Sequence, residues 1–140
     1  MTSATDIEAT VLLCDSAQSV GGKLFILGGG WSLLKKTDQP MSMALAVKLA
    51  IPWSRSNERH RIEVQLETDQ GMAVSHEGQD VRAEGEIEVG RPPGLKPGTP
   101  LDAAFVLAFQ GLALEPGGYV WVLRGGDDAL LARVAFQVVS

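Results

Sequence analysis

Residues 60–68 read HRIEVQLET, and the alternation of apolar and polar side chains in this stretch decides the fold. Ile62, Val64 and Leu66 fall on one face of an extended chain, and polar or charged residues occupy the other face. This period of two is typical of a β-strand with one face buried and one face in water. Residues 81–89 (VRAEGEIEV) repeat the pattern, which favours a protein built mainly of antiparallel strands.

The other apolar segments of the chain also have the length of strands. Residues 9–14, 23–27 and 103–109 are nearly continuous apolar runs, which predicts strands covered on both faces. In residues 43–51 one face carries large apolar side chains and the other carries mostly alanine, so another element could approach that face closely. The expected strands are 9–14, 23–27, 43–51, 60–68, 81–89, 103–109, 119–124 and 130–139.

Glycine-rich turns separate these strands at intervals of about ten residues, as in sandwiches and barrels. We therefore predict a single all-β domain over residues 1–140, an immunoglobulin-like two-sheet antiparallel sandwich of about eight strands, with residues 1–7 as a flexible tail. A closed β-barrel is the alternative. Residues 91–100 hold four of the seven prolines and are expected to form a stiff, polyproline-like crossover. Residues 31–38 and 52–60 have room for about one helical turn each.

Composition and charge exclude several classes of protein. Acidic residues outnumber basic ones 17 to 12, for a net charge of −5, whereas nucleic-acid binders carry a basic surface. The single cysteine, Cys14, is expected to be a small buried core residue. Residues 1–10 lack the features of a signal peptide, and no apolar stretch reaches the length of a membrane span. The sequence predicts a cytoplasmic protein that binds neither nucleic acid nor membrane.

The glycines of GKLFILGGGW, residues 22–31, raise the question of a phosphate-binding loop. Such a loop places Gly-Lys-Ser/Thr after a strand and before a helix, whereas Gly22 and Lys23 precede the apolar run and no hydroxyl residue follows. Gly28–Gly30 likewise open no helix of a dinucleotide-binding unit. We interpret the segment as a hairpin strand that ends in a bulge or bend, where another backbone comes close.

The remaining polar residues form no recognisable catalytic or metal-binding motif. Glu84, Glu86 and Glu88 form an acidic row, but arginines share the same pleats, which is typical of a solvated face with cross-strand ion pairs. His60 and His76 have neither zinc-ligand spacing nor a nearby nucleophile motif, and they are expected to be surface residues. We expect no catalytic residue, no metal ligand and no cofactor.

Tryptophans beside loops supply the candidate interaction surface. Tryptophan and arginine are enriched at interface hot spots, and Trp53 is followed by an arginine-containing loop. The same ring could instead close the end of the sandwich. The candidate surface consists of Trp31, Trp53, Arg55, Arg59 and Arg91.

Two further aromatic residues indicate fold and carry no chemistry. Trp121 is in phase with Tyr119 and Leu123 in an expected strand, which favours a place in the core. Residues 114–119 (LEPGGY) are typical of a tyrosine corner, in which the tyrosine hydroxyl bonds to backbone a few residues upstream.

Several of these stretches resemble a widespread family of small uncharacterised bacterial proteins. The N-terminal pattern of Cys-Asp, a short spacer, Gly-Lys, apolar residues and glycine is similar to the opening of that family. The resemblance implies a β-sandwich of about this length and implies no activity. The stretches that carry it are Leu13–Asp15, Gly22–Leu24, Ile26–Gly28, Gly85–Gly94 and Leu114–Trp121.

The function expected from these observations is a non-enzymatic binding or assembly module that acts through protein–protein contacts. Its partner is another protein or a second copy of the chain, since apolar content is high and residues 43–51 offer an alanine face. One alternative is a small-ligand or carbohydrate-binding sandwich that uses Trp31 or Trp53. A hydrolase that uses the surface carboxylates with His60 or His76 is the remaining alternative.

Overall fold

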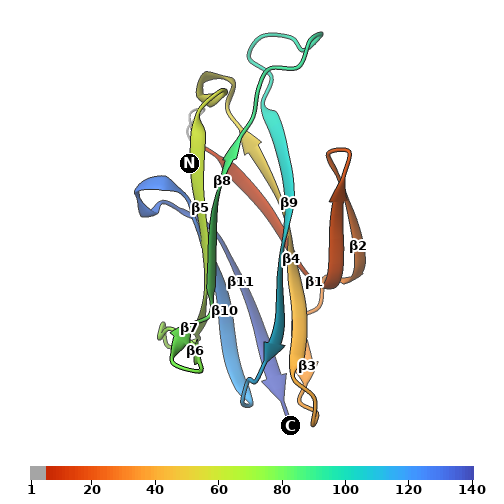
Figure 1. Cartoon of the computed structure of the whole chain (residues 1–140), viewed down its shortest axis with the longest axis vertical. Coiled ribbons are helices and arrows are strands. Elements are labelled where there is room, and N and C mark those ends of the chain that lie inside the picture. Colours follow the sequence, from red (N-terminus) through yellow and green to blue (C-terminus); the bar gives the residue numbers. More distant parts are fainter. Residues whose placement is uncertain (1–5) are drawn as a thin grey trace.

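Two β-sheets lie face to face and form the body of the molecule (Figure 1). The structure is a computed structural model and describes residues 6–140. The first sheet has the strand order β2-β1-β4-β9 and the second has the order β3-β11-β10-β5-β8. The predicted all-β sandwich is confirmed. The strands of the first sheet are β1 (Glu8–Val20), β2 (Lys23–Gly29), β4 (Met41–Ile51) and β9 (Leu101–Leu112).

The second sheet holds the remaining long strands, and short elements lie at its margins. Two short strands form a separate hairpin, and two single-turn 3-10 helices occupy loops. The strands are β3 (Leu33–Lys35), β5 (Arg59–Thr68), β8 (Arg82–Glu88), β10 (Gly117–Arg124) and β11 (Leu130–Val139), the small hairpin is β6 (Ser75–His76) and β7 (Gln79–Asp80), and the helices are η1 (Trp53–Arg55) and η2 (Gly126–Asp128).

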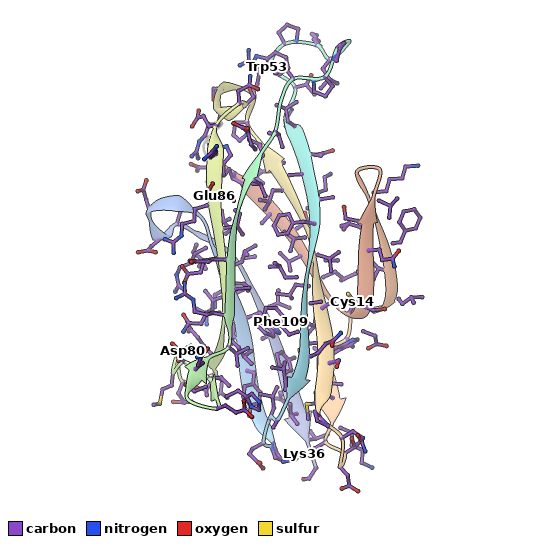
Figure 2. All side chains as sticks on the ribbon, in the orientation of Figure 1. Cys14, Lys36, Trp53, Asp80, Glu86 and Phe109 are labelled. Carbon is purple, nitrogen blue, oxygen red and sulfur yellow. The ribbon has the colours of Figure 1, made fainter. Side chains whose placement is uncertain are left out.

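The core lies between the sheets and follows the period of two in the sequence. Val64 and Leu66 of β5 are fully buried, whereas the polar residues that alternate with them are only partly buried. Trp121 is 1% exposed, and its ring lies tilted against that of Phe109 of the facing sheet, with 4.3 Å between the ring centroids (Phe109 is labelled in Figure 2). Its indole N–H donates to the Met43 sulfur at 3.4 Å. The core position expected for Trp121 is therefore confirmed.

The tyrosine corner is also confirmed. The Tyr119 hydroxyl donates to the Glu115 carbonyl at 2.6 Å, and its ring stacks on Phe136 at 5.6 Å. Burial raises the pKa of this hydroxyl, so the neutral donor form is favoured. The corner fixes the entry of β10 into the second sheet.

All eight expected strands are present, and three short ones are added. Within residues 31–38 the chain forms β3 instead of a helical turn, because the edge of β11 offers unpaired backbone groups. The Gln137 N–H donates to the Ser32 carbonyl at 2.9 Å at the start of this pairing. The β3–β11 pair is parallel and so departs from an all-antiparallel arrangement. Residues 52–60 contain η1, as the room for one turn suggested.

The hairpin of β1 and β2 forms a third layer outside the first sheet (Figure 1). The first half of β1 pairs with β4 as far as Cys14, and beyond this point β1 pairs with β2 alone. The hairpin covers part of the alanine face of β4, where Ala44 and Ala46 are buried beneath Leu24. The close-packing partner of Ala44 and Ala46 is therefore the chain's own hairpin, which takes the place expected for a second copy at these two residues.

The proline-rich crossover connects β8 of the second sheet to β9 of the first. It is not a uniformly extended segment, because it contains two turns in which Gly94 and Gly98 adopt positive φ. The predicted tail, residues 1–7, falls mostly outside the described residues. Of the described part, Ile7 packs against the core.

Candidate functional site

The end of the sandwich between β4 and β5 carries most of the predicted interaction surface (Figure 2). The Arg91 guanidinium lies over the Trp53 ring, 4.3 Å from its centroid. The same guanidinium donates to the Ser56 hydroxyl at 2.6 Å and to the Trp53 carbonyl at 3.0 Å. The Ser56 hydroxyl in turn donates to the Trp53 carbonyl at 2.8 Å. Arg91 therefore holds the proline-rich crossover against the η1 turn.

This arrangement satisfies the groups that suggested a hot spot. One face of the Trp53 ring is occupied by Arg91, and the ring also packs against the core. The Asn57 N–H donates to the Val89 carbonyl at 2.7 Å, which adds a backbone tie between the same two loops. Cation–π stacking and hydrogen bonds of this kind stabilise a loop junction as readily as an interface. The geometry is that of an internal clamp, which we call the Trp53–Arg91 clamp.

Arg55 and Arg59 lie beside the clamp and line an open cavity of about 540 Å³. Its wall combines the start of β1 with the β10–β11 turn, and Leu130 gives it an apolar patch. Arg59 lies 3.9 Å from Glu86, which is a distant ion pair. Arginines and an exposed leucine therefore line the same cavity.

His60 also borders this cavity, but it is not the surface residue that the sequence suggested. Its side chain is 5% exposed, and its Nε2 lies 2.9 Å from the Arg55 carbonyl. The prediction for His60 was wrong because His60 shares the buried phase of Ile62 and Val64 in β5. His76 lies exposed on the small hairpin, 3.9 Å from Glu77.

Trp31 stands apart from the other predicted surface residues. Its ring meets Phe136 edge-on at 6.1 Å, and it packs against the core. The strand that follows it, β3, lies near the end of the sandwich opposite to Trp53 (Figures 1 and 2). The structure therefore brings Trp53, Arg55, Arg59 and Arg91 to one end and places Trp31 elsewhere.

The acidic row of β8 takes part in a charge network with β5. Arg61 lies 2.7 Å from Glu84 and 3.0 Å from Glu63. Arg82 lies 3.1 Å from Glu84 and 3.3 Å from Glu63, which closes a ring of four alternating charges. The predicted cross-strand ion pairs are thereby confirmed. Because Arg61, Arg82 and Glu84 are exposed and only Glu63 is half-buried, each pair contributes little to stability.

The electrostatics of this network oppose acid catalysis. The hydrogen bond and charge of Arg61, with the charge of Arg82, lower the pKa of Glu84, so this carboxyl stays ionised near neutral pH. A general acid needs a raised pKa instead. Among the described residues, no group of three or more His, Cys, Asp or Glu side chains is placed to hold a metal ion.

The glycines of residues 28–30 serve the hairpin. Gly28 adopts φ +59, and a Cβ there would overlap the Asp15 carboxylate. At Gly29 a Cβ would crowd the side chains of Ile26 and Leu12. The close approach is thus made by side chains, whereas the sequence suggested another backbone. The segment leads into β3, so the described chain has no helix here to face a phosphate.

The outward face of the hairpin is the feature that sequence reasoning missed. Residues 23–27 suggested a strand covered on both faces, but the side chains of Phe25 and Leu27 are 55% and 71% exposed. Val20 joins them at 57% exposure. These three residues, which we call the hairpin face, point away from the sheet that the hairpin covers. The sequence held no signal of this exposure, because a continuous apolar run does not show whether a strand is covered on one face or on both.

Comparisons with known proteins identify a family and a fold. The model of a family of unknown function, DUF6941, matches residues 9–139. No curated protein matches the sequence. The structure is similar to part of a β-glucosidase from Listeria innocua, with a TM-score of 0.51 and 10% identity over 96% of this chain and 16% of that one. A β-glucosidase from Kluyveromyces marxianus gives a TM-score of 0.46 and 13% identity over 83% of this chain and 15% of that one.

This chain spans about one sixth of the length of those enzymes. The likeness to the Listeria innocua enzyme shows the fold alone. Within the part of the chain that the structure describes, no helix has the length and apolar character to span a membrane.

Proposed function

The chain belongs to the DUF6941 family, a family of unknown function, and from its own surfaces we propose that it is a non-enzymatic binding or assembly module of the cytoplasm. It acts through protein–protein contacts, and a second copy of the chain is its simplest partner. The observation that carries this proposal is the hairpin face, where Val20, Phe25 and Leu27 remain more than half exposed. Exposed apolar side chains that share one face of a hairpin favour association, because burying them releases water.

The position of β2 supports association with a second copy. It is the outermost strand of the first sheet, so one of its backbone edges has no described strand beside it. Lysine, proline and inward-pointing charges commonly protect such edges, but β2 has only Lys23, at its first residue. Two copies of β2 paired antiparallel would form a two-fold symmetric contact that joins both hairpin faces.

The alternatives have weaker support. A sugar would have to displace Arg91 from the Trp53 ring before it could stack there, and Trp31 already contacts Phe136. For a hydrolase, Glu84 would need to act as an acid, but Arg61 and Arg82 hold its pKa down. Both alternatives would use side chains that already contact other residues of the chain.

The test measures molar mass by light scattering after size exclusion, over a concentration series. We expect the native chain to be a dimer that dissociates on dilution and the double variant Phe25→Ser/Leu27→Ser to be a monomer throughout. Met72→Ser is the matched control, because Met72 is 69% exposed but lies outside the hairpin face. A native chain that stays monomeric at every concentration, or a double variant that associates like the native chain, overturns the proposal.

A further inference from the structure

The two sheets leave one side of the sandwich open, between the edge strands β8 and β9 (Figure 1). A groove of about 260 Å³ runs along this side. Ala83, Gly85 and Ile87 line it from the second sheet, and Phe105 and Leu107 line it from the first. Glu84 and Glu86 also border it, so the groove has an apolar floor, two carboxylates at its margin and a strand edge on each side.

Gly85 is the residue that opens the groove. It lies between Ala83 and Ile87, whose side chains pack against the core, so a side chain at position 85 would point inward as well. A Cβ placed there would meet no atom within 4 Å. The inner row of β8 therefore has a vacant apolar position that faces Phe105 and Leu107 across the seam.

The backbone edge of β8 is open along this groove. β8 ends the second sheet and pairs only with β5 among the described strands. The edge of β9 across the seam is partly capped, because the Ser19 hydroxyl of the hairpin donates to the Ala104 carbonyl at 2.9 Å. An extended segment added to β8 would complete its hydrogen bonds and direct alternate side chains into the groove.

The charges on β8 indicate which side chains such a segment would carry. Glu84, Glu86 and Glu88 point outward from β8. On the paired side, β5 supplies Arg61 at 2.7 Å from Glu84 and Arg59 at 3.9 Å from Glu86. Arg82 of β8 itself also lies 3.1 Å from Glu84, but no described strand lies on the free side to supply cations to Glu86 and Glu88. A segment with lysine or arginine at its outward positions would provide the same cross-strand pairing there.

We propose that the free edge of β8 binds an extended segment of another protein in which apolar residues alternate with lysine or arginine, with one apolar side chain seated at Gly85. A second copy of β8 is a poor occupant, because antiparallel pairing would bring two rows of glutamate together. The inference rests on the proposed function in that both make the domain a protein-binding module. The two use different surfaces, the β8 edge and the hairpin face, and so fail independently.

The test uses labelled synthetic peptides and fluorescence anisotropy with the full chain. We expect a short peptide of alternating valine and lysine to bind, and a peptide of alternating valine and glutamate not to bind. Gly85→Val should weaken lysine-peptide binding about tenfold or more, because the valine fills the vacancy. It should leave the thermal unfolding midpoint unchanged or higher, since valine suits a strand better than glycine.

Further variants distinguish peptide binding at the β8 edge from general effects of a substitution on the protein. Gly126→Val changes another glycine with open space around it, away from the groove, and should leave binding unchanged. Glu86→Gln/Glu88→Gln should weaken binding of the lysine peptide and reduce its dependence on salt. Failure of the lysine peptide to bind, equal binding of both peptides, or a Gly85→Val variant that binds like the native chain overturns the inference. Phe25→Ser/Leu27→Ser should bind the lysine peptide normally, whatever its oligomeric state.

Discussion

The Trp53–Arg91 clamp and the hairpin face reverse what their compositions suggest. The clamp contains tryptophan and arginine, the residues most enriched at interface hot spots, and yet its ring and donors are occupied by the chain's own loops. The hairpin face contains ordinary strand residues, and it keeps three large apolar side chains in water. Residue type is thus a weaker guide to a binding surface than whether the side chain already has a partner.

Replacing Trp53 should give the largest change and tests whether the clamp is structural. Trp53→Ala removes a half-buried ring that packs against the core, so we expect the free energy of unfolding to fall by about 2 kcal/mol, below the range for a fully buried tryptophan. Urea unfolding measures this. In a double-mutant cycle with Arg91→Ala, the coupling should be about 0.5–1 kcal/mol. A negligible loss would mean that the ring is free to serve a ligand.

A glycine in the hairpin should give the next largest effect. Gly28→Ala places a side chain at positive φ and against Asp15, so we expect a loss of about 1–2 kcal/mol in the free energy of unfolding. Gly21→Ala is the matched control, because Gly21 also has positive φ but has open space around it. Equal losses in chemical denaturation would show that backbone strain alone explains Gly28.

Phe25 and Leu24 lie on opposite faces of β2, so their substitution compares an exposed side chain with a covered one. Phe25→Ser should change the free energy of unfolding of the monomer by less than about 0.5 kcal/mol, because the side chain faces water. Leu24→Ala should cost more, about 1 kcal/mol, because Leu24 covers Ala44 and Ala46. Unfolding at low protein concentration measures both. A larger loss for Phe25→Ser would show that the hairpin face is part of the fold.

Acid should weaken the charge network slightly, and this is the smallest effect that we expect. Arg61 holds the pKa of Glu84 below its usual 4.5, so the unfolded chain takes up a proton first as pH falls. The contribution of Glu84 to the free energy of unfolding is therefore complete above the pKa of this carboxyl in the unfolded chain. It is lost as pH falls through the lower pKa in the folded chain. The difference in unfolding midpoint between the native chain and Glu84→Gln should shrink below pH 4.5.

Salt and a second carboxylate provide the controls for this pH effect. Added salt should reduce it, because the network is exposed to solvent. Glu88→Gln removes a carboxylate outside the four-charge ring and controls for the loss of one negative charge from β8. A pH-independent difference for Glu84→Gln would show that the ion pairs do not form in solution.

The strands were predictable because their signal is local. Alternation in residues 60–68 and the apolar runs elsewhere located all eight long strands, and residues 114–119 indicated the tyrosine corner. The same alternation also indicates that His60 is buried, since it is in phase with Ile62, although His60 was predicted to lie on the surface. These features depend only on which face of a strand each side chain takes.

The surfaces were not predictable because they depend on contacts between distant segments. Trp31 and Trp53 look equivalent as residues beside loops, but Phe136 contacts one and Arg91 the other. Whether the alanine face of β4 stayed open depended on where a hairpin about twenty residues earlier in the chain would lie. No periodicity within residues 23–27 distinguishes a strand buried on both faces from one that lies outermost.

The buried cysteine makes the motion of the hairpin measurable. The Cys14 thiol has no exposed surface beneath the hairpin, where it donates to the Ala44 carbonyl at 3.4 Å (Figure 2). Burial also raises the pKa of this thiol, which disfavours the reactive thiolate. Because the sulfur is both covered and protonated, a thiol reagent reacts only when the hairpin lifts and water reaches the sulfur. The rate of Cys14 labelling under native conditions therefore reports how often the third layer detaches from a sandwich that remains folded.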